Sequence, residues 1–216
     1  MKRDYTQVPE SMANMPTYGF SWMDFVTAIP SPLFVLTSYK SNGKPNACLQ
    51  SWASFPGSPR GFYAVLSSVN KAGHFYQTIH ETGEAVINFP SADIYDKCME
   101  TVRNNGFDTD EITAAGLTVE AASKVHAPRI AECFMHLECR YLWEREIHEG
   151  DNHVLMCLDV VNICADVQHL DEGQLGRYGS TGYLYNIHHP INPENFTGKA
   201  HDWIATLNKY RDMGEY

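Results

Sequence analysis

Runs of apolar and alternating residues divide the chain into short extended segments separated by turns. Asn42-Gly43 lies between the first two runs and predicts a tight hairpin, because this pair adopts the backbone conformation that two-residue hairpin turns require. A Gly-Asp-Asn turn separates the two longest runs. Clusters of Gly, Pro, Asn and Ser also lie at the ends of the other extended runs, as is typical of strands. The predicted strands cover residues 32–39, 46–54, 61–67, 84–89, 132–147 and 153–165.

Helical periodicity is confined to four shorter stretches. Helices are predicted over residues 22–28, 71–81, 92–103 and 199–212. The second ends before Gly83, since helices commonly end at a glycine. In the last, Trp203, Ile204 and Leu207 share one face, which is typical of an amphipathic helix. Residues 104–131 carry turn residues and show little periodicity, and residues 173–195, rich in Gly, Tyr, Asn and Pro, predict an extended loop.

Hairpin-connected strands with helices at the margins predict a mainly β fold. Strands this hydrophobic must close on each other or pair, because an open edge exposes unpaired backbone groups. We therefore expect a closed barrel with accessory helices. The domain organisation that follows is an N-terminal arm and helix (1–29), the barrel (30–190) and a C-terminal helix packed on it (191–216).

Composition narrows the range of partners. Hydrophobic residues make up 44% of the 216 positions, enough for a substantial core. A formal charge of −10 argues against nucleic acid as a partner, so an anionic ligand must be held by a local arrangement of donors. No apolar run reaches the length of a membrane span, and the first residues lack the apolar core of a secretory signal. We expect a cytoplasmic protein with no membrane partner.

The six cysteines are scattered without metal-binding spacing. The cytoplasmic expectation favours reduced cysteines that act as small core residues. A structural zinc site is the alternative, and the spacing gives it no support, so no metal is predicted. The cysteines are Cys48, Cys98, Cys133, Cys139, Cys157 and Cys164.

Two polar clusters are candidates for binding chemistry. In the strand 46–54, alternation places Asn46, Cys48, Gln50, Trp52 and Ser54 on one face and smaller residues on the other. A polar and aromatic face suits a flat ligand lying against the backbone. An ordinary solvated strand face explains the same pattern about as well.

The second cluster, Ser67-Ser-Val-Asn-Lys71, stands where a strand gives way to a helix. Hydroxyls, an amide, a lysine and free helix N–H groups at one point form a phosphate site. Ser68 and Asn70 can equally be plain helix caps. His74 and Phe75 follow one turn later and can flank the same ligand.

The histidines show no catalytic or metal-binding pattern. His188, His189 and His201 are expected to be solvated loop residues. His153 differs because it opens a strand directly after the Gly-Asp-Asn turn, where a side chain can face a barrel mouth. No dinucleotide-binding or phosphate-loop glycine motif is present, so a nicotinamide nucleotide would have to bind by another route, such as stacking on a flavin.

The chain carries an ordered series of short motifs: the strand 32–37, Asn42-Gly43, Asn46-Ala47, residues 51–54, Ser67 with Asn70-Lys71, residues 81–83, 86–90, 115–117, 128–133, 137–139 and 150–153. No single motif is diagnostic, and the order of the series makes it specific. Over about residues 30 to 190, the series resembles the flavin reductase-like FMN-binding domain family, nearest to its flavoredoxin branch.

The resemblance implies a split β-barrel with FMN in a groove at a homodimer interface. It implies flavin-ring and ribityl contacts from Asn46, Ala47, Cys48, Gln50, Ser51, Trp52, Ala53 and Ser54. It implies phosphate and ribityl contacts from Ser67, Ser68, Asn70, Lys71 and His74, with Phe75 beside them. His153 matches a family histidine associated with nicotinamide access and hydride transfer. Three departures are Asn152 inserted before His153, Cys48 at a position where a hydroxyl or small residue is common, and Phe75 in place of the usual threonine.

Three functions follow from these expectations. The first is a reductase that passes a hydride from NADH or NADPH to FMN and on to a small acceptor. The second is an electron carrier that keeps FMN bound and exchanges electrons with a redox protein. The third is a binding module without redox turnover. The absence of an acid–base motif agrees with the first two, because the reactive electronics belong to the cofactor.

Overall fold

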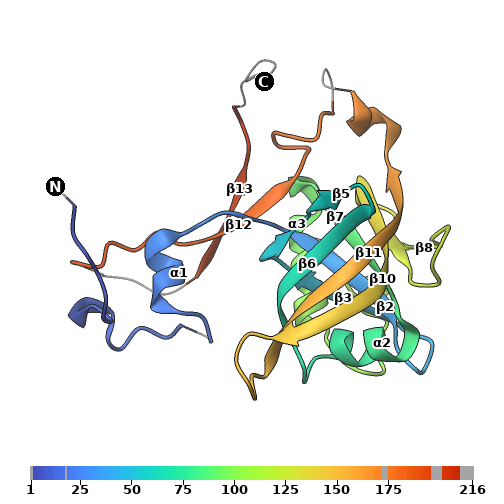
Figure 1. The fold of residues 1–216 in the computed structure, drawn as a ribbon. Coiled ribbons are helices and arrows are strands. Elements are labelled where there is room, and N and C mark those ends of the chain that lie inside the picture. The colour runs from blue at the N-terminus through green and yellow to red at the C-terminus, as the bar shows by residue number, and fades with distance from the viewer. Residues whose placement is uncertain (1, 18, 172–174, 196–200, 210–216) are drawn as a thin grey trace. The chain divides into compact units, whose positions relative to one another are not determined.

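The computed structural model describes residues 2–17, 19–171, 175–195 and 201–209. Helices and short 3-10 turns are η1 (Glu10–Met12), α1 (Trp22–Thr27), α2 (His74–Thr82), η2 (Ala92–Ile94), α3 (Tyr95–Arg103), α4 (Glu111–Ala114) and η3 (Val167–Leu170). The strands are β1 (Ser31–Pro32), β2 (Phe34–Tyr39), β3 (Pro45–Gln50), β4 (Ala53–Ser54), β5 (Gly57–Ser58), β6 (Gly61–Asn70), β7 (Glu84–Phe89), β8 (Val119–Glu120), β9 (Arg129–Ile130), β10 (Met135–Glu146), β11 (His153–Ala165), β12 (Leu184–His188) and β13 (Asp202–Thr206) (Figure 1).

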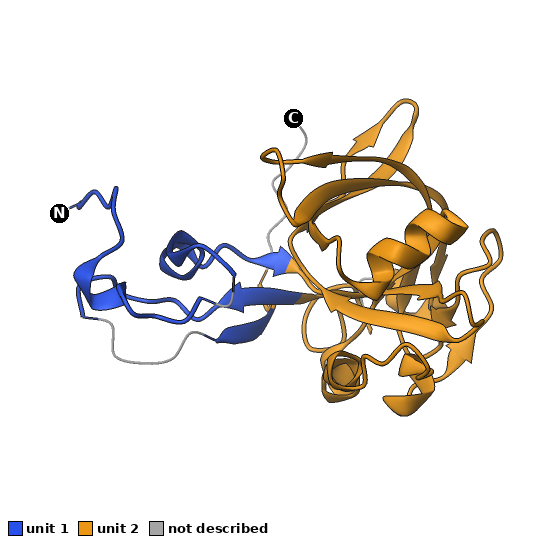
Figure 2. Cartoon of the chain, turned by 90° about the horizontal axis from the view of Figure 1, so that it is seen from below, with its two compact units in different colours: residues 1–31, 185–205 blue, residues 32–184, 206–216 orange. Residues whose placement is uncertain are grey.

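The chain forms two compact units, coloured separately in Figure 2. One contains residues 1–31 and 185–205, and the other contains residues 32–184 and 206–216. Among the described residues, no helix is long and apolar enough to cross a membrane. The predicted barrel falls in the larger unit.

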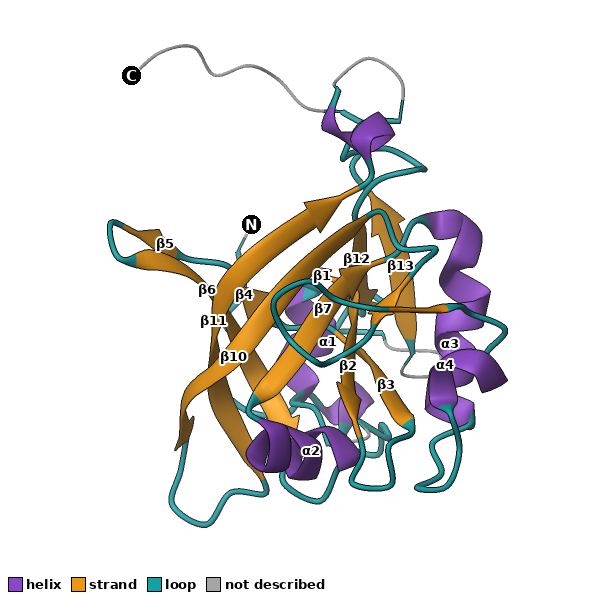
Figure 3. Ribbon diagram, turned by 90° about the vertical axis from the view of Figure 1, so that its right-hand side faces the viewer, coloured by secondary structure: helices purple, strands orange, loops and turns teal. Residues whose placement is uncertain are grey.

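An antiparallel sheet in the order β3-β2-β7-β10-β11-β6-β4 builds the larger unit, with β5 paired to β6 (Figure 3). β3 and β4 stand at opposite ends of this order, although only Ser51 and Trp52 separate them in the chain. Three Cα–Cα steps span at most about 11 Å, so the sheet must curl until its two edges approach each other. The mainly β split-barrel prediction is confirmed.

The turn between β3 and β4 bends the chain away from regular strand geometry. Trp52 has φ +55°, a left-handed conformation that side-chain-bearing residues rarely adopt. The single strand predicted over 46–54 is therefore interrupted after Gln50, where the chain passes from one edge of the sheet to the other. Period-2 alternation holds up to this point: Ala47 and Leu49 pack on one side, and Cys48 packs on the other.

The core has two layers because β2 is buried on both faces. Leu36 packs inside the barrel with Phe34, Ile87 and Met156. Val35 faces the opposite way and packs with residues of α3 and α4, which cover β3 (Figure 3). The consecutive apolar residues Phe34, Val35 and Leu36, which begin β2, follow from this arrangement.

Buried polar residues connect β2, β7 and β10. Asn88 donates from Nδ2 to the carbonyl of Val35 and to Thr37 Oγ1, at 3.0 and 2.9 Å. Its Oδ1 accepts from the amide of Ile130 and lies 2.9 Å from His136 Nδ1. These bonds satisfy groups that would be costly to bury alone.

A buried ion pair, Arg129 with Glu138, lies close to His136 of this network. Glu138 is fully buried and pairs with Arg129, while its oxygens also accept from the amides of Ser123 and Lys124. Burial acts to raise the pKa of Glu138, but the amides and the guanidinium outweigh it and lower the pKa to about 2.

Several sequence predictions need correction. The helix predicted over 199–212 is wrong, because residues 202–206 form β13, which pairs with β12; residues 199, 200 and 210–212 lie outside the described residues. β12 lies within the loop predicted over 173–195. His188 is not solvated: it is 2% exposed, and its Nδ1 lies 2.6 Å from Asp202 Oδ1.

The remaining elements agree well with the sequence patterns. Helices α1, α2 and α3, the hairpin at Asn42-Gly43 and the long β10–β11 pair begin and end within three residues of the predicted positions. Gly83 ends α2 at φ +69°, as predicted. All six cysteines are unpaired, and four of them (Cys98, Cys133, Cys139 and Cys157) are buried, in agreement with their interpretation as core residues. The boundaries proposed for three domains stay a prediction.

The buried imidazole of His136 makes stability depend on pH. Burial, aided by the charge of Arg129, lowers the pKa of His136 to about 4. The unfolded chain therefore binds a proton more readily, and this contribution to stability is lost as pH falls from about 6.5 towards 4. We expect the free energy of unfolding, measured by urea titration, to fall by about 3 kcal/mol over this range through His136 alone.

The variant His136→Gln should flatten this part of the profile. His148→Gln, which alters an exposed turn histidine, should leave the profile unchanged. Equal pH profiles for the wild type and His136→Gln would contradict the assignment.

Candidate functional site

A cavity of about 230 Å³ opens between the edge strand β3 and the end of β6, at the N-terminus of α2. Seven of the fourteen predicted cofactor-binding residues line it: Asn46, Ala47, Cys48, Gln50, Asn70, His74 and Phe75. The other lining residues are Leu49, Val69, Gly73, Thr101, Val102 and Asn105. Both polar clusters predicted from the sequence therefore contribute to one cavity.

Asn46 presents an unsatisfied donor at this cavity. The residue is 1% exposed, and its Nδ2 has no hydrogen-bond partner. A buried amide without a partner costs free energy, so such groups are uncommon unless a ligand completes them. Asn46 therefore fits a ligand that carries hydrogen-bond acceptors.

The first turn of α2 faces the same cavity with its backbone amides uncapped. Gly73 is the N-cap residue and offers no side chain to these amides. His74 and Phe75, which begin the helix, both line the cavity. A helix N-terminus with free amides favours an anion, through its hydrogen bonds and its dipole.

The turn before α2 differs from the sequence prediction. The helix was predicted from residue 71 and begins at His74, because β6 continues to Asn70 and residues 71–73 form a turn. Asn70 Oδ1 accepts from the amide of Ala72 at 2.9 Å, and the Asn70 carbonyl accepts from the amide of Gly73. Asn70 thus stabilises the turn before the helix. It is not the helix cap that the sequence left open, because the N-cap residue of α2 is Gly73 and no side chain caps the helix.

Ser67 and Ser68 lie at an irregularity of β6. Leu66 pairs with Met156 and Val69 pairs with Val154, so both serines oppose the single residue Leu155. Such a bulge bends a strand and redirects its side chains, and bulges are frequent beside active sites. Neither serine lines the cavity.

Lys71 is paired away from the cavity. Its ammonium group contacts the carboxylate of Glu146 on β10, and this hydrogen bond is the main cause that lowers the pKa of Glu146. Ser51, Trp52, Ala53 and Ser54 also lie outside the cavity lining, along the link and strand that follow β3. Their predicted contacts with a cofactor stay predictions.

His153 is exposed at the start of β11 and is the register partner of Asn70 on β6. Directly opposed residues of antiparallel strands project on the same face of the sheet. Because Asn70 lines the cavity, His153 stands one strand away from the cavity wall. This placement is compatible with its predicted role.

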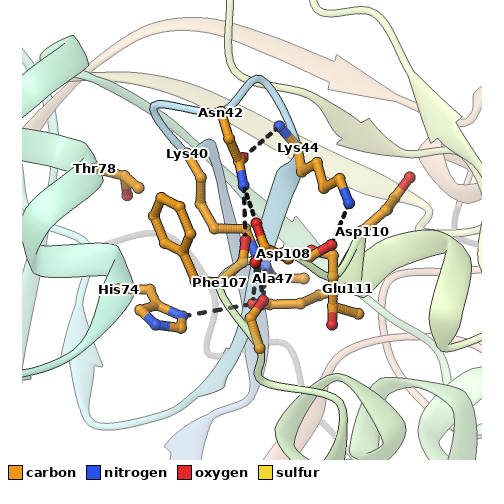
Figure 4. Close-up of polar contacts among 12 residues, drawn as sticks. Lys40, Asn42, Lys44, Ala47, His74, Thr78, Phe107, Asp108, Asp110 and Glu111 are labelled. Carbon is orange, nitrogen blue, oxygen red and sulfur yellow. Dashed lines mark hydrogen bonds and ion pairs between the residues drawn. The ribbon is translucent and has the colours of Figure 1, made fainter.

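A buried ion pair supports the wall formed by β3. Lys40 and Glu111 have fully buried side chains, and Lys40 Nζ lies 2.8 Å from Glu111 Oε1. The same ammonium donates to the carbonyls of Gly106 and Thr109, at 2.8 and 2.7 Å. Figure 4 shows this cluster, in which Lys40 satisfies one side of a carboxylate that also contacts Ala47 and His74.

Sequence reasoning missed Lys40, Glu111, Thr101, Val102 and Asn105. The segment 104–131 shows little periodicity, so nothing placed its Glu111 in the interior. The buried positions of α3 are Cys98 and Thr101, which give no clear apolar stripe in the sequence and do not identify β3 as the neighbour of this helix. No sequence signal pointed to Lys40.

Comparison with known proteins agrees with this geometry. Residues 26–185 match the family described as "Flavin reductase like domain". The chain belongs to this family. This match confirms the resemblance seen in the sequence. Members of this flavin-binding family are oxidoreductases.

One curated relative, an uncharacterized protein of Methanothermobacter thermautotrophicus, is 30% identical over 137 residues. The match covers 62% of this chain and 63% of that protein, so it spans less than two thirds of the relative.

Solved structures share the fold at low identity. Flavoredoxin of Desulfovibrio vulgaris (Miyazaki F) has a TM-score of 0.68 and 20% identity, over 86% of this chain and 91% of that chain. Nitrilotriacetate monooxygenase component B of Bacillus cereus has a TM-score of 0.71 and 17% identity, over 94% and 98%. An NADH:FAD oxidoreductase of Streptomyces globisporus has a TM-score of 0.57 and 16% identity, over 67% and 81%.

The buried pair at Lys40 yields a stability prediction. Lys40→Met leaves the Glu111 carboxylate buried without its counterion, and breaking such a pair costs about 3–5 kcal/mol of unfolding free energy. Lys44→Met is a matched control, because Lys44 reaches the same loop at Asp108 from an exposed position. Its cost should stay within about 1 kcal/mol. Urea titrations that give equal losses for the two variants would contradict this account.

Proposed function

We propose that the protein is an FMN-binding flavoprotein, in which the cavity at the N-terminus of α2 receives the FMN phosphate. The observation that carries the proposal is the meeting of the uncapped first turn of α2 with the buried, unpartnered Nδ2 of Asn46. Together they offer several N–H donors to one anion. In a chain of net charge −10, this local arrangement favours a phosphate group that the overall field would repel.

The volume of the cavity suits the phosphate end of FMN better than the whole molecule. Sites that enclose complete ligands measure roughly 300–1,000 Å³, and this cavity measures about 230 Å³. We infer that the ribityl chain and the ring extend beyond it along residues 50–54, where the family resemblance implies their contacts. A second copy of the chain would then complete the site, as the family resemblance implies.

Exposed apolar side chains on the β10–β11 hairpin support such a homodimer. Leu142, Trp143 and Ile147 are 49%, 40% and 58% exposed. Large apolar groups gathered on one hairpin favour burial against another surface. The hairpin continues past the end of β7, which pairs only with residues 135–140 of β10.

The reaction proposed is transfer of a hydride from NADH or NADPH to the flavin and then to a small acceptor. When bound, FMN supplies the redox chemistry. The chain contributes anchoring at Asn46 and α2, orientation along β3, and His153 beside the open face where a nicotinamide would approach. The NADH:FAD oxidoreductase of Streptomyces globisporus shares this fold, which supports the proposal.

The second candidate is an electron carrier that keeps FMN bound and reacts with partner proteins. The shared fold of flavoredoxin from Desulfovibrio vulgaris favours it. Both candidates use the same flavin site and differ in their reaction with free nicotinamide nucleotides.

Flavin binding tests the site. The purified protein should be yellow or take up added FMN, and the loaded protein should sediment as a dimer of the 24.4 kDa chain. Asn46→Ala should weaken FMN binding by about tenfold, since one hydrogen bond to a charged group contributes roughly 1.5 kcal/mol. Gln77→Ala, on the exposed side of α2, serves as the control and should bind normally. A purified protein that neither contains nor takes up FMN would contradict the proposal.

Stopped-flow mixing with NADH and NADPH separates the two candidates. Rapid loss of the absorbance of bound flavin with either nucleotide is expected for the reductase. His153→Ala should slow this phase by tenfold or more, on the order of a positioned catalytic side chain, while FMN affinity stays unchanged. Inertness of the FMN-loaded protein to both nucleotides would favour the carrier.

A further inference from the structure

One buried carboxylate, that of Glu111, contacts three segments of the chain around the proposed phosphate cavity. Its Oε2 accepts a hydrogen bond from the amide of Ala47 on β3 at 2.8 Å. Its Oε1 lies 2.8 Å from Nζ of Lys40, the residue directly after β2, and 3.7 Å from His74 Nδ1 on α2 (Figure 4). Two of these partners, Ala47 and His74, line the cavity.

The bond to Ala47 satisfies an amide at the edge of the sheet. β3 pairs with β2 along one side only, so its other side presents unpaired backbone groups. By accepting from Ala47, Glu111 fixes β3 directly beside Asn46. The carboxylate therefore sets the position of the cavity wall that carries the unpartnered amide.

Lys40 pairs with Glu111 and has no hydrogen-bonding capacity to spare. An ammonium group has three donors, and those of Lys40 are taken by Glu111 and by the carbonyls of Gly106 and Thr109. The Lys40 ammonium contacts the same Glu111 oxygen that lies near His74, and all of its donors are used within the protein. His74 is the remaining titratable group within ion-pair distance of Glu111 among the residues that the structure describes.

His74 meets Glu111 at a distance too long for a hydrogen bond, and its Nδ1 has no hydrogen-bond partner. A neutral imidazole gains little from this contact, whereas an imidazolium is attracted by the carboxylate. The ring centre of Phe107 lies 6.1 Å from that of His74, and Asn46 and Cys48 line the same cavity. Burial raises the pKa of the Cys48 thiol, so Cys48 brings no charge to the cavity. Lys71 is paired with Glu146 instead.

We propose that Glu111 is a positioning residue for the phosphate site, which holds His74 as an imidazolium between its own carboxylate and the bound phosphate. The proposal rests on the proposed function for the identity of the ligand, a flavin that carries a phosphate group. Binding then takes up one proton from solvent onto His74 whenever the free imidazole is neutral. Riboflavin has the same ring and ribityl chain without the phosphate, so it takes up none.

The test compares FMN and riboflavin binding between pH 7 and 8.5 by quenching of flavin fluorescence. The second ionisation of a phosphate group lies near pH ~6, so FMN keeps an almost constant charge in this range. Free imidazole titrates near pH ~6.5, so one linked proton lowers FMN affinity by up to about tenfold per pH unit. Riboflavin affinity should stay flat. Calorimetry in buffers of different ionisation enthalpy should report uptake of close to one proton with FMN.

Two variants remove the proposed link by different routes. Glu111→Gln alone would strand the buried Lys40 charge, so it is combined with Lys40→Met to remove both charges together. His74→Asn removes the titrating group and leaves the buried pair intact. Both variants should lose the pH slope of FMN binding and bind FMN about tenfold less tightly at pH 7, with riboflavin affinity unchanged. His80→Asn, on the same helix and paired with Glu144, should keep the wild-type slope.

The outcomes are distinguishable. A wild-type slope that persists in His74→Asn or in the double variant overturns this inference while FMN binding itself stands. An equal slope for riboflavin also overturns it, because the linked group would then sense the ring. A wild-type protein that binds neither flavin overturns the proposed function and this inference with it.

Discussion

The link of two residues between β3 and β4 determines the arrangement of the larger unit. These strands lie at opposite ends of the sheet order, and no connection this short can join them unless the sheet curls. Curling leaves β3 as an edge beside the end of β6, where ladder pairing does not close the gap. The cavity lies there, and α2 starts at the same point. The position of the site is therefore a consequence of how the barrel closes.

Charge around this opening is arranged in pairs rather than left to the field of an acidic chain. Lys40 pairs with Glu111 in the interior, and Lys71 pairs with Glu146 outside the cavity lining. Backbone amides of α2 and the amide of Asn46 remain as donors, and neither depends on net charge. Neutral donors and a helix terminus can hold an anion without a cluster of lysines, so a strongly acidic protein can bind a phosphate.

The sequence predicted those parts of the fold whose signal is local. The Asn42-Gly43 hairpin, Gly83 at the end of α2 and the apolar run of β2 each carry their own cue, and the structure agrees. The helix predicted over residues 202–206, which form a strand, was wrong because Trp203 and Ile204 fit helical and extended patterns equally well. The partner of this strand, β12, lies more than a dozen residues earlier in a segment that reads as loop.

The candidate site shows the same limit. Asn46 and His74 were found because each belongs to a recognisable polar cluster beside a strand end. Glu111 was not, because its burial depends on Lys40, 71 positions earlier in the chain, and a single glutamate in a turn-rich segment is ordinarily solvated. Half of the predicted cofactor contacts line the cavity, while those from Ser51 to Ser54 depend on a ligand that extends past it.

The left-handed backbone of Trp52 has an implication for how this chain can vary. An insertion or deletion within residues 50–53 would shift β4 against β6 and reverse which side chains face inward, since neighbouring residues of a strand alternate in direction. Length changes are tolerable in the turn beyond β5, which is open to solvent and holds no edge together. Among homologous proteins, the distance in residues from Asn46 to Ser54 should therefore be nearly invariant, even where the identities of the residues between them are not.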